Sequence, residues 1–298
     1  MTDLPDQAPS RHGRPFSGAD WALLTAVALM WGTSFLFIEI ALETVSPTVV
    51  AWARVLFGAI ALGCVRAARQ PVTRADWPMI GVLGLVWLGV PFVLFPLAQQ
   101  SIDSSLAGMI NGATPLFTVL IAVAWTRRLP ATYQRVGLLV GFAGVVAVNW
   151  PAVQGADATT VGVVLAVLAA VFYGVAFNIA PPLQARNGTL PVIWRAQLVA
   201  LVALSGPAAV DWSGWGWSWS AWSALVALGV LSTGVAFAAF VTLISTVGAT
   251  RGSVAVYFIP IVAIVVGVVF AGEKVAVVSL VGTGLVLVGA WLTSRRET

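Results

Sequence analysis

LGLVWLGVPFVLF, at residues 83–95, aligns with LGVLSTGVAFAAF, at residues 228–240, with an offset of 145 residues. The same offset brings Pro115 onto Pro260, Gly137 onto Gly282 and Gly144 onto Gly289. At a slightly different offset, WG at 31–32 matches YG at 173–174. Chance similarity between apolar stretches is the alternative, but the shared glycine and proline spacing favours a duplication. We predict two related halves, 19–150 and 151–298, after a tail at 1–18.

Both halves are apolar enough to lie in a bilayer. Of the 298 residues, 59% are hydrophobic and 9% are charged, whereas soluble domains carry about 25% charged residues. A helix needs about 20 mostly apolar residues to cross the hydrocarbon core. Charges, prolines and glycines bound ten such windows, at 20–41, 47–65, 76–97, 104–126, 132–150, 160–182, 190–210, 220–244, 249–271 and 275–293. The predicted fold is all-α and integral to the membrane, with ten transmembrane helices.

The charges between these windows predict an orientation. Five spans per half is an odd number, so the second half enters the bilayer upside down relative to the first. Twelve arginines lie in the N-terminal segment, the even-numbered connections and the C-terminal segment, against Lys274 alone in the odd-numbered connections. Because lysine and arginine are enriched in cytoplasmic loops, both termini are expected in the cytoplasm.

An inverted repeat favours one class of function. Two related halves that pack about an axis in the membrane plane can expose a cavity at mid-depth to one side and then to the other. This is how many secondary transporters work, and a scaffold protein does not require it. The sequence therefore predicts a secondary transporter that works by alternating access around a central cavity.

Several stretches resemble a known family. FAGEK at 270–274 and SLVGTGLVLVGAWL at 279–292 follow Pro260, and QRVGLLVGFAGVVAV at 134–148 follows Pro115. WGTSFLFIEIAL at 31–42 and WARVLFGAIAL at 52–62 resemble the openings of such a repeat. Together they resemble the EamA domains of the drug/metabolite transporter superfamily, over nearly the whole chain beyond about residue 18.

The resemblance carries expectations and one departure. It implies a basket of ten helices in a bacterial inner membrane, with spans 3, 4, 8 and 9 lining a cavity and spans 1 and 6 contributing. Substrates in the family include amino acids, other metabolites and amphipathic drugs. The acid usual after the fourth span is replaced by Arg127 and Arg128, whereas Glu273 keeps it in the second half. This departure counts against any mechanism that needs two symmetric acids.

Other classes of function lack their residues. The only histidine, His12, lies in the polar tail, so neither a Ser–His dyad in the membrane nor a histidine metal site is expected. No phosphate-binding Walker A loop is present, so no ATP-driven step within this chain is expected. The net charge of +4 comes from short loops and predicts no nucleic-acid partner. The single cysteine, Cys64, is expected to be buried and excludes an intramolecular disulfide. We predict no cofactor and no enzyme activity.

Two ionisable residues inside the spans are candidates for gating or coupling. Glu39 is near the outer end of span 1, and Arg54 is about 10 Å below the outer end of span 2, from the rise of an α-helix. They either pair with each other or extend to the headgroups. In the functional alternative, Glu39 gates the outer mouth or accepts a proton.

Spans 4 and 9 carry a small and polar stripe. Asn111 and Pro115 lie on it in span 4, and Tyr257 and Pro260 lie on it in span 9. Spacings of three and four residues place each set on one helix face. Each proline frees a backbone carbonyl, which lipid does not tolerate unless protein or cavity water satisfies it. The stripe is interpreted as a cavity wall with two hinges; close helix packing is the alternative.

Aromatic side chains form the third candidate set. They lie at related positions of spans 1, 3, 6 and 8, where an aromatic cavity would bind apolar or aromatic groups. Ordinary helix packing is the alternative. The set, with a neighbouring amide, is Trp31, Phe35, Phe92, Phe95, Tyr173, Phe177, Asn178 and Phe237.

These patterns favour a transporter for a small-molecule substrate. The specific prediction is export of amino acids, with apolar and aromatic ones favoured. A multidrug or other-metabolite efflux carrier is the nearest alternative, and a passive channel is a second. An intramembrane enzyme acting on lipid would need clustered Asp, His or Ser groups at one depth, which the sequence lacks.

Overall fold

The computed structural model describes residues 17–127, 132–153, 157–211, 215–247, 252 and 254–294. This part of the chain is helical, and its only β-type pairing is an isolated antiparallel bridge between Val45 and Trp215. Most of the predicted tail, with His12, lies outside the described residues. The helices of the first half are α1 (Gly18–Gly32), α2 (Ser34–Leu42), α3 (Pro47–Gly63), α4 (Trp77–Leu83), η4 (Gly84–Gly89), α5 (Val90–Ala98), α6 (Ser104–Asn111), α7 (Thr114–Thr126) and α8 (Thr132–Val153), with short 3-10 turns at Arg66–Arg69 and Arg74–Asp76. Those of the second half are α9 (Asp157–Asn187), α10 (Thr189–Val210), α11 (Trp219–Gly229), η6 (Val230–Val235), α12 (Ala236–Val247), α14 (Val254–Tyr257), α15 (Ile259–Phe270) and α16 (Val277–Ser294).

Helix length and composition support a membrane protein. In the described part of the chain, six continuous helical segments are long and apolar enough to cross a bilayer, and four shorter apolar helices occupy the remaining predicted windows. The six are Gly18–Leu42, Arg74–Ala98, Ser104–Thr126, Thr160–Asn187, Thr189–Val210 and Trp219–Val247. The all-helical, multi-pass class is therefore confirmed. The count of ten spans stays a prediction, as do the boundaries of the two halves.

Local sequence explains where the helices start and break. Ser17 begins α1 with a capping box, in which its backbone N–H donates to the Asp20 carboxylate at 2.8 Å. Pro115 occupies the start of α7 just after a break at residues 112–113. Its repeat partner Pro260 starts α15 just after a break at Phe258. Both halves are thus interrupted at the same repeat position, because proline begins a helix but cannot continue one.

A second interruption also recurs. The stretch that reveals the repeat forms a π-helix in each half, η4 at Gly84–Gly89 and η6 at Val230–Val235. A π-helix widens one turn and often marks a functional position. The repeat therefore places wide turns, as well as proline breaks, at corresponding depths of the two halves.

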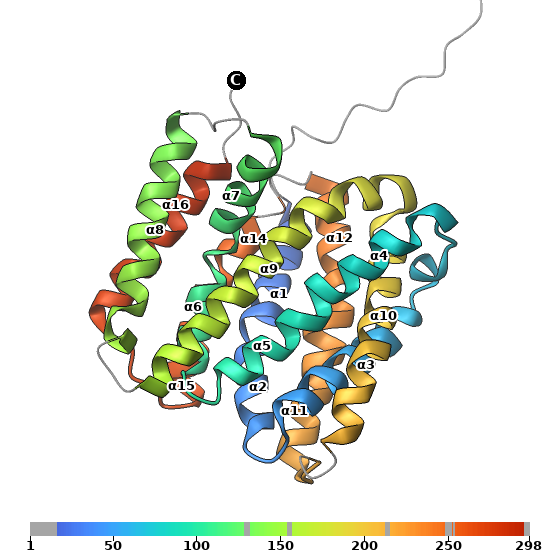
Figure 1. The fold of residues 1–298 in the computed structure, drawn as a ribbon, viewed down its shortest axis with the longest axis horizontal. Helices are drawn as coiled ribbons and strands as arrows, with labels where there is room; N and C mark the ends of the chain where they lie inside the picture. The colour runs from blue at the N-terminus through green and yellow to red at the C-terminus, as the bar shows by residue number, and fades with distance from the viewer. Residues whose placement is uncertain are drawn as a thin grey trace, which may run out of the picture.

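The last helices of the two halves cross closely at one edge of the molecule. Figure 1 shows α8 and α16 side by side there. A Cβ atom on Gly144 of α8 would collide with the backbone of Gly282 and Val286 of α16. A Cβ atom on Gly282 would in turn collide with the backbone of Val148 and Gly144. Small residues thus let the two backbones approach at matched positions.

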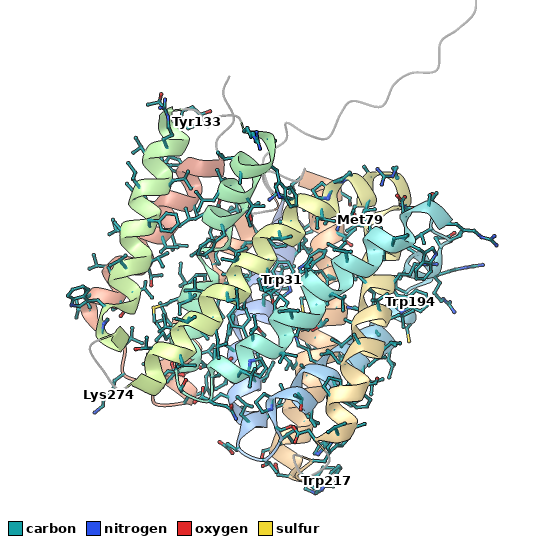
Figure 2. The ribbon with its side chains drawn as sticks, in the orientation of Figure 1. Trp31, Met79, Tyr133, Trp194, Trp217 and Lys274 are labelled. Atoms are coloured by element: carbon teal, nitrogen blue, oxygen red, sulfur yellow. The ribbon has the colours of Figure 1, made fainter. Side chains whose placement is uncertain are left out.

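The two ends of the molecule are chemically distinct. Figure 2 places Trp217 and Lys274 at one end, Tyr133 toward the other and Trp31 near the middle. Trp217 is 66% exposed, as expected for a membrane-interface belt. Toward the opposite end, Arg186 donates two hydrogen bonds to Asp76, at 2.6 and 3.2 Å, and so ties α9 to the start of α4. Cys64 is exposed at the C-terminal end of α3, so the expectation that it is buried was wrong; the apolar helix ends just before it.

Candidate functional site

A cavity of about 320 Å³ lies at the centre of the molecule. This volume is at the lower end of the range for small-molecule sites. Helices from both halves contribute side chains to its wall. They are Trp31, Ser34, Phe35, Arg54, Trp87, Phe92, Phe95, Asn111, Thr114, Tyr173, Phe177, Ala180, Pro181, Gln184, Thr189, Ile193, Ser232, Phe237, Phe240, Ile244, Val256 and Ile259.

Aromatic rings contact one another around this wall. Phe35 lies 5.3 Å from Phe95, and Phe95 lies 5.9 Å from Tyr173, between ring centroids. Tyr173 stacks on Phe177 with an interplanar angle of 9°. The contacts then continue from Phe177 to Trp87 at 5.6 Å, from Trp87 to Phe237 at 5.4 Å and from Phe237 to Trp31 at 5.9 Å. The chain of rings draws on both halves and presents an apolar, polarisable surface to the cavity.

A few polar atoms interrupt the apolar wall. The Asn111 amide oxygen and the Ser232 hydroxyl are buried without a hydrogen-bond partner in the described part of the chain. The carbonyl of Asn111, freed by Pro115, accepts a hydrogen bond of 2.7 Å from the Thr114 hydroxyl. A buried acceptor without a donor is costly, so the Asn111 amide is poised for a polar group in the cavity.

One charged side chain lines the cavity. Arg54, on α3, is only 7% exposed, and its guanidinium carbon lies 3.8 Å from the centre of the Phe92 ring. Its Nε donates to the Thr233 hydroxyl at 3.1 Å, and that hydroxyl donates to the Leu228 carbonyl at 3.1 Å. Thr233 belongs to η6, so the second half's π-helix orients an arginine of the first half.

The cavity is asymmetric along the helix axes. At its Gln184 and Thr189 side, it approaches the short connection between α9 and α10. At the other side, beyond Phe35 and Phe95, a packed apolar cluster that includes Ile38 and Val49 fills the space. The cavity thus extends toward one end of the molecule, while side chains fill the core at the other end.

Comparison with known proteins agrees with this architecture. The EamA-like transporter family matches residues 19–150 and again residues 160–295. The chain belongs to the EamA-like transporter family. A "probable terminal-alkyne amino-acid exporter" of Streptantibioticus cattleyicolor is 28% identical, covering 94% of each chain. An "uncharacterized transporter" of Archaeoglobus fulgidus is 21% identical over 93% of this chain and 99% of its own length.

Further relatives include a membrane protein and a solved structure. The "uncharacterized inner membrane transporter YedA" of Escherichia coli K12 is 24% identical and covers 89% of this chain and 87% of its own. A solved structure aligns over 93% of this chain and 96% of its own, with a TM-score of 0.61 and 21% identity. It supports the fold alone. The resemblance to the drug/metabolite transporter superfamily is confirmed by the family match.

Within this EamA fold, most of the sequence-predicted site residues meet at the cavity. Both halves contribute. The residues found in the wall are Trp31, Phe35, Arg54, Phe92, Phe95, Asn111, Tyr173, Phe177 and Phe237.

Four predicted binding residues lie behind the wall. The Asn178 amide donates to the carbonyls of Thr118 at 3.0 Å and Gly174 at 2.9 Å, so it ties α9 to α7. Tyr257 donates its hydroxyl to the Ala290 carbonyl of α16 at 3.1 Å. Pro115 and Pro260 start the second segments of their broken helices. These four residues shape the backbone and the contacts between helices instead of the cavity surface.

Glu39 and Arg54 do not form the pair that the sequence suggested. Arg54 turns to Phe92 and Thr233, whereas Glu39 interacts with Ser104 and Glu273 at the end of the molecule that carries Lys274. One Glu39 carboxylate oxygen is buried without a hydrogen-bond partner in the described part of the chain. The two ionisable residues therefore lie in different regions of the molecule and have different partners.

Glu273, the acid that the second half retains, has a structural role. Its carboxylate accepts hydrogen bonds from the backbone N–H groups of Ser104 at 2.9 Å and Ser105 at 3.0 Å. It thereby caps α6, whose own N-cap residue, Asp103, makes no capping hydrogen bond. Burial, followed by the nearby Glu273 charge, raises the pKa of the Asp103 carboxyl above its ordinary value. The acid of one half thus stabilises a helix of the other half.

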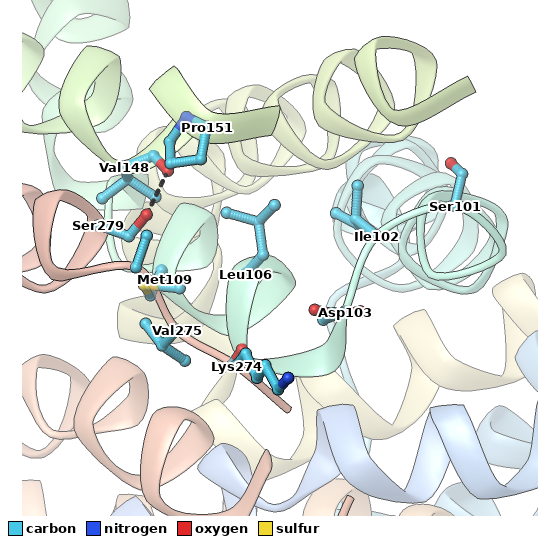
Figure 3. A pocket seen from close by; sticks show the side chains of 12 residues that line it. Ser101, Ile102, Asp103, Leu106, Met109, Val148, Pro151, Lys274, Val275 and Ser279 are labelled. Atoms are coloured by element: carbon cyan, nitrogen blue, oxygen red, sulfur yellow. Dashed lines mark hydrogen bonds between the residues drawn. The ribbon is translucent and has the colours of Figure 1, made fainter. Parts of the chain in front are cut away.

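A second pocket of about 300 Å³ adjoins this capped end. Figure 3 shows Asp103 and Lys274 at its rim and the hydrogen bond that Ser279 donates to the Val148 carbonyl, at 3.0 Å. Its charged groups are at the surface, and it is separate from the aromatic cavity. Among the described residues, no cluster of three His, Cys, Asp or Glu side chains could hold a metal ion.

The sequence analysis did not identify several residues of the cavity wall. Trp87 and Ser232 occupy the same position of the two repeats, and both line the cavity. Phe240, by contrast, is aligned with Phe95 by the offset of 145 residues, and it also lines the cavity. Gln184 and Thr189 lie beside an interhelical connection, where helix periodicity gives no signal for a cavity wall.

Proposed function

We propose that this EamA protein is a secondary transporter that exports amino acids, with apolar and aromatic ones preferred, by alternating access across the inner membrane. The observation that carries the proposal is the chain of contacting aromatic side chains in the wall of a central cavity with few polar groups. Such a surface favours the side chains of phenylalanine, tryptophan, tyrosine and leucine by burial and stacking. The similarity to a probable amino-acid exporter supports the same substrate class.

The proposed topology indicates which side of the membrane the cavity faces in this structure. With both termini in the cytoplasm and the second half inverted, the Gln184 and Thr189 side of the cavity faces the cytoplasm. The packed cluster around Ile38 and Val49 then closes the periplasmic side. This is the loading state of an exporter. Broken and π-helical segments at equivalent positions provide the hinges by which the two halves exchange roles.

We assign proton coupling to Glu39. It lies on the proposed periplasmic side of the cavity, and the ionisable side chains around it are Glu273 and Asp103. Three carboxyl groups in one region repel one another when they are charged. Since Glu273 caps α6 through backbone hydrogen bonds, protonation at Glu39 can change without uncapping that helix.

The experiment is transport into proteoliposomes of a panel of radiolabelled amino acids, with and without a pH gradient. Saturable movement of aromatic and branched-chain amino acids is expected, whereas non-saturating movement would indicate a channel. Glu39→Gln is expected to keep exchange at equilibrium and to lose the response to the gradient. Movement of cationic drugs but of no amino acid would replace the proposal by multidrug efflux.

A further inference from the structure

We propose that Arg54 binds the carboxylate of the transported substrate, so that the central cavity selects molecules with an apolar body and a negatively charged end. This inference rests on the proposed function and deepens it. It gives Arg54 a role in substrate recognition, in place of the predicted role in gating or coupling.

The contacts of Arg54 leave the recognition face of its guanidinium free. Its Nε is engaged by the Thr233 hydroxyl, and its plane lies against the Phe92 ring. In the described part of the chain, no acceptor hydrogen-bonds its two terminal nitrogens and no carboxylate forms an ion pair with it. These nitrogens are a planar pair of donors with the spacing of the two oxygens of a carboxylate.

The electrostatic balance also requires an anion. A buried cation without a partner is unfavourable, because the low-dielectric interior does not replace its hydration. The neutral Thr233 hydroxyl and the Phe92 ring offset only part of that cost. The ionisable side chain that interacts with Arg54 is Tyr173, which stands in the same wall and supplies no formal negative charge as a phenol. A substrate carboxylate would complete the site.

The surroundings favour carboxylates over cations. The charged residue in the cavity wall is Arg54; the described lining contains neither aspartate nor glutamate. A cationic drug would meet an unpaired positive charge and no acid. For an amino acid, the buried amide oxygen of Asn111 offers the ammonium group an acceptor in the same cavity.

Thr233 acts as a positioning residue in this scheme. It belongs to the π-helix η6, and its hydroxyl bridges the Leu228 carbonyl and the Arg54 Nε. The π-helical turn of the second half therefore orients the Arg54 guanidinium of the first half. Thr233→Val should make that orientation less fixed without removing the charge.

The test uses the full-length protein in proteoliposomes with labelled phenylalanine and two competitors of matched shape. 3-Phenylpropionate has the carboxylate without the ammonium, and 2-phenylethylamine has the ammonium without the carboxylate. We expect 3-phenylpropionate to compete at least tenfold better in the wild type. In Arg54→Gln that preference should disappear, with binding of phenylalanine about 10- to 100-fold weaker, the size expected for loss of a charge-assisted hydrogen-bonded pair.

Matched variants separate recognition from folding. Arg54→Lys keeps the charge and should restore part of the carboxylate preference, and Thr233→Val should weaken it less than Arg54→Gln does. Arg195→Gln removes an arginine that lies outside the cavity wall and donates to the carbonyls of Ala68 and Pro191; it should leave the preference unchanged. Each variant is first checked for a wild-type melting profile in detergent.

Direct binding keeps the inference testable if transport fails. Trp31 and Trp87 line the cavity, so quenching of tryptophan fluorescence reports occupancy by 3-phenylpropionate or 2-phenylethylamine. Absence of amino-acid transport together with Arg54-dependent binding of 3-phenylpropionate would overturn the proposed function alone. Equal binding of acid and amine, or a carboxylate preference that survives Arg54→Gln, would overturn the role of Arg54.

Discussion

The α8–α16 pair and the wall of the central cavity come from the same repeat, but their backbones differ. α8 and α16 are single helices, of 22 and 18 residues, that approach each other through glycines. Around the cavity, by contrast, α1 and α2, α6 and α7, and α14 and α15 are broken pairs, and η4 and η6 are π-helical. The repeat has therefore produced a regular brace at the edge and an irregular, hinge-rich wall at the centre.

The difference between the two regions shows which interactions carry each function. In the α8–α16 pair, matched glycines bring backbone against backbone, which leaves no room for movement without loss of packing. At the cavity, the cross-half contacts include contacts between side chains, as in the Trp87–Phe237 and Arg54–Thr233 contacts. Side-chain contacts can be exchanged as the halves move, so the brace should control stability and the wall should control transport.

Breaking the brace should have the largest effect on stability. Gly144→Ala places a methyl group against the backbone of Gly282 and Val286. Overpacking of this kind typically costs about 1–3 kcal/mol, and we expect a lower denaturation midpoint in detergent with substrate affinity unchanged in the folded fraction. Gly284→Ala, on the same helix α16, is the matched control, since a Cβ there meets no atom within 4 Å. Equal destabilisation by both variants would contradict a stabilising role for the close glycine contacts between α8 and α16.

A substitution in the cavity wall should change the affinity for substrate instead of the stability of the fold. Trp31→Ala removes the ring that contacts Phe240 at 5.0 Å and Phe237 at 5.9 Å. We expect the half-saturation concentration for phenylalanine to rise about tenfold, on the order of 1.4 kcal/mol. Alanine transport should change much less, because alanine has no ring to stack. Transport assays in proteoliposomes measure both.

Two controls sharpen the Trp31 experiment. Trp31→Phe keeps an aromatic ring and should lie near the wild type. Trp217→Ala removes an exposed tryptophan outside the cavity wall and should leave both substrates unaffected. If Trp31→Ala weakened phenylalanine and alanine equally, Trp31 would act through general packing and not as a stacking surface.

The sequence predicted the elements of both regions better than their contacts. Apolar windows and the 145-residue offset identified the helices, the paired prolines and most of the aromatic wall, because helix periodicity and repeat spacing are local signals. The partner of Arg54 was not predictable in this way. Glu39 and Arg54 lie on adjacent helices, but one interacts with Glu273 and the other with Thr233, and only the packed structure fixes which way each side chain turns.

The same limit applies to the residues behind the wall. Asn178 and Tyr257 have the polarity of site residues, and Tyr257 has the spacing of the polar stripe of span 9, yet both donate hydrogen bonds to backbone carbonyls of neighbouring helices. Tertiary packing decides between these uses, since a polar side chain near the cavity can also reach a backbone carbonyl of a neighbouring helix. Sequence periodicity identifies the face of a helix but not the neighbour that a side chain on that face meets.

The smallest effect is expected at a contact between the halves outside the cavity and the brace. Hydrogen bonds from the Ser46 and Thr48 hydroxyls hold the pKa of Asp211 below its usual value and tie the end of α10 to the start of α3. A lowered carboxyl pKa in the folded state adds stability above the unfolded pKa of about 3.9, and this stability is lost as pH falls through the folded pKa. Because Asp211 is outside the spans and the contact is at the surface, Thr48→Ala should lower the melting temperature only slightly at pH 7.

The pH dependence of that small difference distinguishes the tie from a general packing effect. Wild type and Thr48→Ala should differ at pH 7 and converge as the pH falls through the lowered pKa of the Asp211 carboxyl, where its native hydrogen bonds no longer favour a charge. Thr242→Ala is the control, since the Thr242 hydroxyl donates to the Ala238 carbonyl of its own helix and no carboxylate is involved. A difference between wild type and Thr48→Ala that stayed constant from pH 7 until Asp211 was fully protonated would assign Thr48 to packing of α3 and would show that the Asp211 contact does not join the two halves.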